Sequence, residues 1–169
     1  MGEGFRHPID NIQWVDVDTL EANDYNPNVV YTPELKLLKL SILQNGWIQP
    51  ILASQNKVII DGFHRWKLAQ TDKEVREFTW ERVPCAILEL TEAERMALTI
   101  RINRAKGSHI AVKLHDIAIK LVEEYGMSQE EIAKQIGATK QEVDLLLMDG
   151  VFQKLDIPNH RYSRAWYPK

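Results

Sequence analysis

The sequence predicts an α+β domain followed by an all-α helix-turn-helix domain. Three observations lead to this prediction. Short apolar runs typical of strands alternate with helical patterns between residues 12 and 109. A β-branched run at residues 58–60 stops at Asp61-Gly62 and turns directly into a helix. Residues 110–150 then carry only helical patterns, separated by glycine turns.

The first elements follow a polar arm at residues 1–11. Residues 12–17 alternate as a strand does, with Val15 and Val17 on one face. The Asn, Asp and Pro content of residues 20–28 predicts a loop.

A helix with an apolar stripe is expected next. Thr32 and Pro33 supply its cap and first turn, and Gly46 ends it in left-handed geometry. Residues 47–52 then lead into another strand.

The helix after Gly62 runs to about residue 70, and the charged residues 71–81 are predicted to be irregular. Residues 83–88 form the next strand. It contains Cys85, whose setting indicates a small core residue rather than a reactive thiol. Residues 91–94 resemble a capping box that starts a further helix.

The strand-turn-helix at residues 58–69 is the first candidate site. Gly62 permits a close ligand approach, and His64 and Arg65 fall in the first helical turn, where free N–H groups favour an anion. An arginine adds a planar fork suited to phosphate. On local physics alone, an ordinary turn capped by Asp61 explains the same residues equally well.

The second candidate anion site lies at the end of the helix that starts near residue 92. Cations and hydrogen-bond donors are packed into residues 101–109, a composition that suits a phosphate chain. A helix C-terminus with basic residues that complement the dipole is the alternative. The candidate ligands are Asn103, Arg104, Lys106, Ser108 and His109.

The second domain, residues 110–150, shows a helix-turn-helix signature. Ser128 opens a capping box, Gly137 makes the turn, and Thr139 caps the last helix. The candidate DNA contacts are Thr139, Lys140 and Gln141. Several acids share that helix, and acids oppose phosphate binding, so a packing or protein-binding role is the alternative. A basic aromatic tail at residues 151–169 can contact nucleic acid or dock on its own domain.

The composition sets limits on function. The chain has 169 residues, a net charge of −3 and one cysteine. It therefore lacks the strong positive charge of many nucleic-acid binders, and it can form neither an internal disulfide nor a cysteine-based zinc cluster. No signal peptide or membrane span is visible, so we expect a cytoplasmic protein.

These motifs together resemble the ParB/sulfiredoxin superfamily. The resemblance rests on Asp-Gly-x-His-Arg before an aromatic residue and on an upstream Gly-x-x-Gln-Pro-Ile segment. It implies a small mixed sheet with helices, and a nucleotide pocket lined by Gly46, Gln49 and Pro50. Phe63 stands where sulfiredoxin has its cysteine, so sulfiredoxin chemistry is not expected.

The resemblance also implies site residues and partners. Asn103 and Arg104 lie at a helix end that binds triphosphate in ParB proteins, usually as Glu-Asn-x-x-Arg; this chain lacks the Glu and has the shorter Asn103-Arg104 spacing. Glu21 lies where related free-serine kinases have a proposed base. The most similar type is the prophage co-activator of the immunoglobulin-binding-regulator class, found beside a phosphoadenosine-phosphosulfate-reductase-like partner. The long C-terminal dimerisation domain of segregation ParB proteins is missing from this sequence, so a sliding-clamp role is not expected.

Two functions fit these expectations. The first is a nucleotide-responsive DNA-binding regulator of phage or mobile-element origin. It would bind ATP, ADP or CTP, and a homodimer is one of the assemblies that fit it. The second is a phosphoryl-transfer enzyme with Arg65 and Arg104 as phosphate clamps. In it, His64 or Glu21 acts as general base and Asp61 holds Mg²⁺. A nuclease fits less well, because the sequence lacks clustered metal-binding acids.

Overall fold

The computed structural model describes residues 7–24, 32–105 and 111–148. Its strands are β1 (Ile12–Asp16), β2 (Ile51–Ser54), β3 (Ile59–Asp61) and β4 (Arg82–Leu88). They form one sheet in the order β1-β4-β2-β3. The β2–β4 pair is parallel and the other two pairs are antiparallel. The sheet is therefore mixed, which confirms the predicted fold class.

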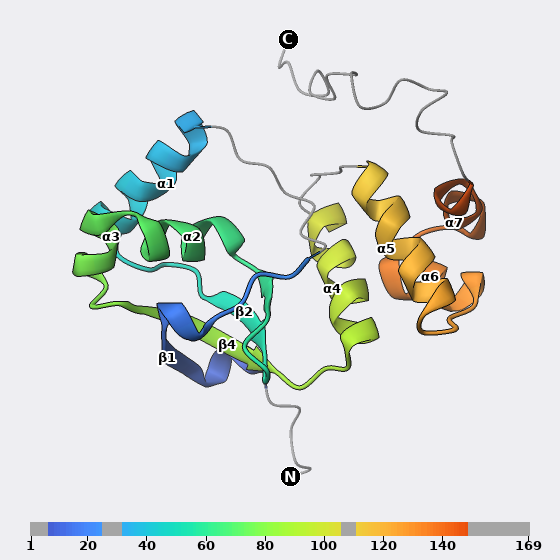
Figure 1. Cartoon of the computed structure of the whole chain (residues 1–169), viewed down its shortest axis with the longest axis horizontal. Helices are drawn as coiled ribbons and strands as arrows, with labels where there is room; N and C mark the ends of the chain where they lie inside the picture. Colours follow the sequence, from blue (N-terminus) through green and yellow to red (C-terminus); the bar gives the residue numbers. More distant parts are fainter. Residues whose placement is uncertain (1–6, 25–31, 106–110, 149–169) are drawn as a thin grey trace.

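The helices are divided between two parts of the molecule. The helices α1, α2 and α3 lie with the sheet, and α4 to α7 form the second group (Figure 1). Within the described ranges the helical elements are η1 (Pro8–Asp10), η2 (Val17–Thr19), α1 (Thr32–Asn45), α2 (Phe63–Thr71), α3 (Lys73–Phe78), α4 (Glu92–Ala105), α5 (Ala111–Glu123), α6 (Gln129–Ile136) and α7 (Lys140–Leu147).

Reciprocal capping boxes start the two helices of the helix-turn-helix unit. Ser128 and Glu131 form the box of α6, and Thr139 and Glu142 form that of α7. In both, the glutamate accepts hydrogen bonds from the cap residue and lies at the positive end of the helix dipole. These contacts lower the pKa of both glutamates. Both predicted helix starts are confirmed.

The prediction that residues 71–81 are irregular is wrong, because α3 occupies most of them. The Asp72 carboxylate caps α3 by accepting hydrogen bonds from the N–H groups of Glu74 and Val75. Lys39 of α1 forms ion pairs with Asp72 and Glu74, at 2.9 Å each. Val75 is fully buried. One buried residue and one cap therefore hold a short helix inside a charged run.

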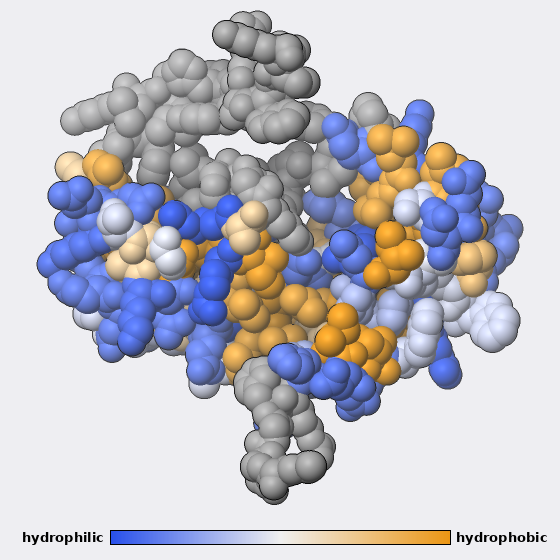
Figure 2. Space-filling model, turned by 180° about the vertical axis from the view of Figure 1, so that it is seen from behind, coloured by the Kyte–Doolittle hydropathy of each residue, from blue (hydrophilic) through white to orange (hydrophobic). Residues whose placement is uncertain are grey.

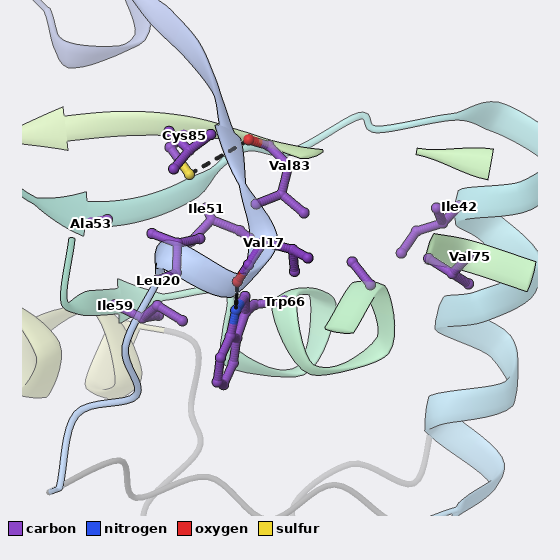
Figure 3. Close-up of a cluster of buried hydrophobic side chains, with 12 residues drawn as sticks. Val17, Leu20, Ile42, Ile51, Ala53, Ile59, Trp66, Val75, Val83 and Cys85 are labelled. Carbon is purple, nitrogen blue, oxygen red and sulfur yellow. Dashed lines mark hydrogen bonds between the residues drawn. The ribbon is translucent and has the colours of Figure 1, made fainter. Parts of the chain in front are cut away.

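The first hydrophobic cluster lies between the sheet and helices α1 to α3 (Figure 3). Val15 of β1 and Val17 directly after it, which the alternation places on one face, are both buried. Trp66 of α2 is also buried, and its indole N–H donates to the Val17 carbonyl at 2.9 Å. Because both groups are removed from water, this bond fixes α2 against the chain that follows β1.

The second hydrophobic cluster joins α4 to the helix-turn-helix unit. Met96, Ala97 and Ile100 of α4 are buried against α5, α6 and α7. The hydroxyl of Thr99, also buried, donates to the carbonyl of Ile60 in β3 at 3.4 Å. Helix α4 thus contacts both the sheet and the helical half.

Some large apolar side chains remain exposed. Leu37 and Leu40 of α1 are 66% and 49% exposed. The view from behind shows apolar surface between polar regions (Figure 2). Scattered exposed apolar residues are normal on soluble folds. Across the described ranges, no helix combines the length and apolarity needed to cross a bilayer.

We expect Trp66→Phe to lower the free energy of unfolding by about 1–3 kcal/mol, because it leaves the buried Val17 carbonyl without its donor. Chemical denaturation measures the change. Trp80→Phe is the matched control: Trp80 is 86% exposed, so the same substitution should cost under about 0.5 kcal/mol. Equal losses in the two variants would contradict the role given to the Trp66 bond.

Candidate functional site

The predicted strand-turn-helix is present. β3 ends at Asp61, Gly62 has a φ of 95°, and α2 starts at Phe63. Gly62 offers no side-chain cap to α2. Within the described ranges, no side chain caps the N–H groups of the first helical turn, and the helix dipole favours an anion there.

The Arg65 guanidinium is held by two neighbours. It donates to the Gln49 carbonyl at 2.7 Å and lies 3.4 Å from the Asp61 carboxylate. Its side chain is only 12% exposed, and burial lowers its pKa while Asp61 opposes that change. Arg65 therefore ties the 46–50 loop to the end of β3, and its predicted phosphate contact has to be made from this position.

A small cavity of about 130 Å³ lies beside Arg65. It is lined by the end of α1 and by the 46–49 loop, which includes the predicted residues Gly46 and Gln49. Pro50 follows directly and is half-buried. The cavity is smaller than the roughly 300 Å³ of a pocket for a whole drug-sized ligand, so it can take only part of one.

His64 is half-buried next to the same turn. Its ring edge packs on Phe63, with the ring centroids 5.3 Å apart. Burial lowers the pKa of His64, and the nearby Asp61 charge opposes the shift. The ring is therefore neutral at neutral pH. Its Nε2 atom is buried and has no hydrogen-bond partner among the described residues.

Asp61 is the predicted metal ligand. Its carboxylate pairs with Arg65 and is 16% exposed. Among the residues that the structure describes, no three His, Cys, Asp or Glu side chains gather closely enough to hold a metal ion. A Mg²⁺ ion at Asp61 would therefore need oxygen ligands from water and from a bound phosphate.

Glu21, the predicted general base, lies beside β3. Its backbone forms a parallel bridge with Val58, and its carbonyl accepts the Ile59 N–H at 2.9 Å. Its side chain is exposed. Glu21 therefore pairs with the start of β3, and Asp61 lies at the other end of that strand. The structure assigns no role to the Glu21 carboxylate.

Two further residues at the site were missed in the sequence. The Asn23 amide donates to the Ile59 carbonyl at 2.7 Å, and its Oδ1 atom is buried without a partner in the described ranges. Trp47 lines the cavity, and its indole nitrogen is likewise buried without a partner in the described ranges. The only sequence signals are the Asn-rich loop and the position of Trp47 inside the Gly-x-x-Gln-Pro segment.

The second candidate anion site contacts the helix-turn-helix unit. Arg104 donates to the Gly137 carbonyl and to the Glu142 carboxylate, each at 3.4 Å. Asn103 is buried. The other predicted ligands, Lys106, Ser108 and His109, lie outside the described residues, so their arrangement around a phosphate stays a prediction.

The three predicted DNA contacts occupy the start of α7. The Thr139 side chain belongs to the capping box. The Lys140 ammonium lies 2.5 Å from a carboxylate oxygen of Glu130 in α6. Gln141 is exposed.

A family model described as the ParB N-terminal domain matches residues 6–104, which is more than half of the chain. The chain belongs to the ParB N-terminal domain family. This confirms the resemblance drawn from the strand-turn-helix and the Gly-x-x-Gln-Pro-Ile segment. The narrower resemblance to prophage co-activators stays a prediction.

Two relatives illustrate the range of ParB-like sequences similar to this one. The uncharacterized protein YbdM of Escherichia coli (strain K12) is 36% identical over 166 residues, covering 96% of this chain and 78% of the relative. The nucleoid occlusion protein of Bacillus pumilus (strain SAFR-032) is 26% identical over 134 residues, covering 76% of this chain and 44% of the relative. The chain therefore spans about half the length of relatives of the second kind.

Solved structures confirm the ParB fold. A Pnob8-like ParB-N domain has a TM-score of 0.64 at 12% identity, with 90% of this chain and 75% of that chain covered. The C-terminally truncated chromosome-partitioning protein ParB from Caulobacter crescentus, complexed to the centromeric parS site, has a TM-score of 0.54 at 22% identity. That match covers 86% of this chain and 78% of the other.

We expect Gly62→Ala to destabilise the protein more than Gly126→Ala does. Both glycines have positive φ, so both variants carry backbone strain of about 1 kcal/mol or more. A Cβ at residue 62 would also lie 3.1 Å from Arg65 Nη2 and 3.3 Å from the Ile51 Cα, whereas nothing lies within 4 Å at residue 126. Denaturation of both variants measures the difference, and equal losses would show that the site tolerates a side chain at this turn.

We expect the Cys85 thiol to be unreactive in the folded protein. Cys85 is fully buried, and burial raises the pKa of its thiol to about 12, so the thiolate is absent at neutral pH. A thiol-exchange reagent should react only after denaturant is added. Rapid labelling of the native protein would contradict this assignment and make Cys85 a candidate reactive residue.

Proposed function

We propose that the protein is a nucleotide-binding regulatory protein that associates with DNA. The observation that carries the nucleotide half of this proposal is the uncapped start of α2, next to Gly62 and the Arg65 fork. Backbone N–H groups at a helix start suit phosphate oxygens, and a guanidinium adds a fixed pair of donors.

In this proposal the phosphates bind at the first turn of α2. The cavity beside Arg65, which Gly46 and Gln49 line, takes another part of the nucleotide, and Pro50 follows directly in the chain. Asp61 holds Mg²⁺ through one carboxylate oxygen, with phosphate and water completing its ligands. Asn103 and Arg104 extend the phosphate site from α4.

The DNA half of the proposal rests on the family and on the helix-turn-helix geometry. The ParB of Caulobacter crescentus, which shares this fold, was solved with its parS site. In this chain α6 and α7 are joined by the Gly137 turn, and α7 starts with Thr139 as its cap. A second helix presented in this way reads DNA in many regulators.

The narrower features of the proposal come from the sequence. They are a role in transcription regulation of the prophage type, a homodimer, and a phosphoadenosine-phosphosulfate-reductase-like protein partner. The segment at residues 102–107 and the basic aromatic tail support them. Co-purification from the native host tests the two protein contacts.

Phosphoryl transfer is the second candidate function, and His64 supports it. A neutral imidazole next to the proposed phosphate site has the protonation state that a general base needs, and the structure describes no partner residue for its buried Nε2 atom. Released phosphate, measured in the nucleotide-binding samples, separates a binding protein from an enzyme. Turnover that persists in His64→Gln would remove His64 from this role.

We expect Arg65→Lys to weaken nucleotide binding at least about tenfold, because lysine keeps the charge and loses the planar fork. Calorimetry with CTP, ATP and GTP in the presence of Mg²⁺ measures the affinity and identifies the base. Lys67→Gln, on the exposed side of the same helix, removes a charge and keeps the fork. It should leave the affinity within about twofold.

Two results would overturn the assignment. Wild-type affinity in Arg65→Lys, with an unchanged circular dichroism spectrum, would place the phosphates elsewhere. An equal loss in Lys67→Gln would show that net charge, and not the fork, controls binding.

A further inference from the structure

The cation at the start of α7, Lys140, forms an ion pair with another residue of the same protein. The Lys140 ammonium lies 2.5 Å from the Glu130 carboxylate, which belongs to the first turn of α6. Lys140 is the first residue of α7, where the positive end of the helix dipole disfavours a cation. The carboxylate of Glu130 offsets this, which explains why the two side chains meet.

The Lys140–Glu130 pair is open to water. The side chains are 56% and 64% exposed, so each can exchange its partner for another ion. An exposed pair of this kind contributes little to stability, so separating it costs little. The pairing lowers the pKa of Glu130 and raises that of Lys140, so both stay charged at neutral pH.

Two acids of α7 also lie near this surface. The charge of Asp144 acts on Lys140 from within the same helix, and Glu142 is bound differently. Glu142 pairs with Arg104 at 3.4 Å, but it also accepts the Thr139 N–H at 2.7 Å as part of the α7 capping box. Removing its charge would therefore weaken the cap at the start of α7 as well as free an arginine. Glu130 has no such capping contact to Ser128, whose partner is Glu131. The Glu130 carboxylate accepts from its own backbone N–H in the first turn of α6, and a glutamine oxygen can still accept there, so Glu130→Gln changes chiefly the charge facing Lys140.

We propose that Glu130 occupies the position at Lys140 that a DNA phosphate takes in the bound state, and thereby sets the DNA affinity of the helix-turn-helix unit. This inference rests on the proposed DNA association. A phosphate that approaches the start of α7 has to displace Glu130 before it gains the Lys140 cation. In the free protein Lys140 therefore adds nothing to the attraction, and the acid adds repulsion.

A double-mutant cycle tests this. We expect Glu130→Gln to raise the affinity for a labelled duplex of mixed sequence by about threefold to tenfold. We also expect it to steepen the slope of log affinity against log salt by about one, the value for one more phosphate neutralised. Lys140→Met should change little alone, and in the Glu130→Gln background it should remove the gain. Fluorescence anisotropy over a salt series gives all four values.

Glu123→Gln is the matched control, because Glu123 is an exposed acid of α5 and the variant changes the net charge equally. It should leave the salt slope unchanged. Additive effects of Glu130→Gln and Lys140→Met, or an equal gain in Glu123→Gln, would overturn the inference and leave the DNA association standing. If the wild type and all variants fail to bind the duplex at low salt, the DNA association itself is refuted, and the inference with it.

Discussion

The candidate site depends on the two contacts that the Arg65 guanidinium makes. The guanidinium lies under the Gly62 turn and joins the Gln49 carbonyl to the Asp61 carboxylate. The 46–50 loop, the end of β3 and the first turn of α2 are therefore held by one planar group. Since this side chain is only 12% exposed, its N–H groups need acceptors from the protein or from a ligand. Gly62 satisfies the same geometry, because any side chain there would meet the guanidinium.

Helix α4 extends this arrangement toward the second half of the molecule. Its Thr99 hydroxyl contacts the carbonyl of Ile60, the residue before Asp61. Further along, Arg101 donates to the carbonyl and side chain of Gln135, and Arg104 donates to Gly137. One helix therefore contacts the strand that ends at the candidate phosphate site and the turn of the helix-turn-helix unit. A change at either end has a direct path of packed atoms to the other.

The local elements were predictable where the signal lies within a few residues. The capping box of α6, the Thr139 cap of α7, the left-handed Gly46 and the shared face of Val15 and Val17 all follow from neighbouring residues. Helix α3 was missed because its only buried side chain is Val75 and its charged residues carry no stripe. Asp72 was the one signal, and a capping aspartate is equally common in turns. Asn23 and Trp47 were missed because their surroundings are formed by residues far away in the sequence. The Asn23 amide, for example, donates to the carbonyl of Ile59.

The sequence by itself determined the fold class, the family and the strand-turn-helix with its phosphate-compatible helix start. These rest on periodicity, caps and short motifs, which act over one or two turns of chain. Only the tertiary structure decided where the charges go. Arg65 bonds a carbonyl 16 residues away, Arg104 an acid 38 residues away, and Lys140 an acid 10 residues away. Each of these partners is set by which helices and loops pack together. The spacing of residues along the chain does not reveal that packing.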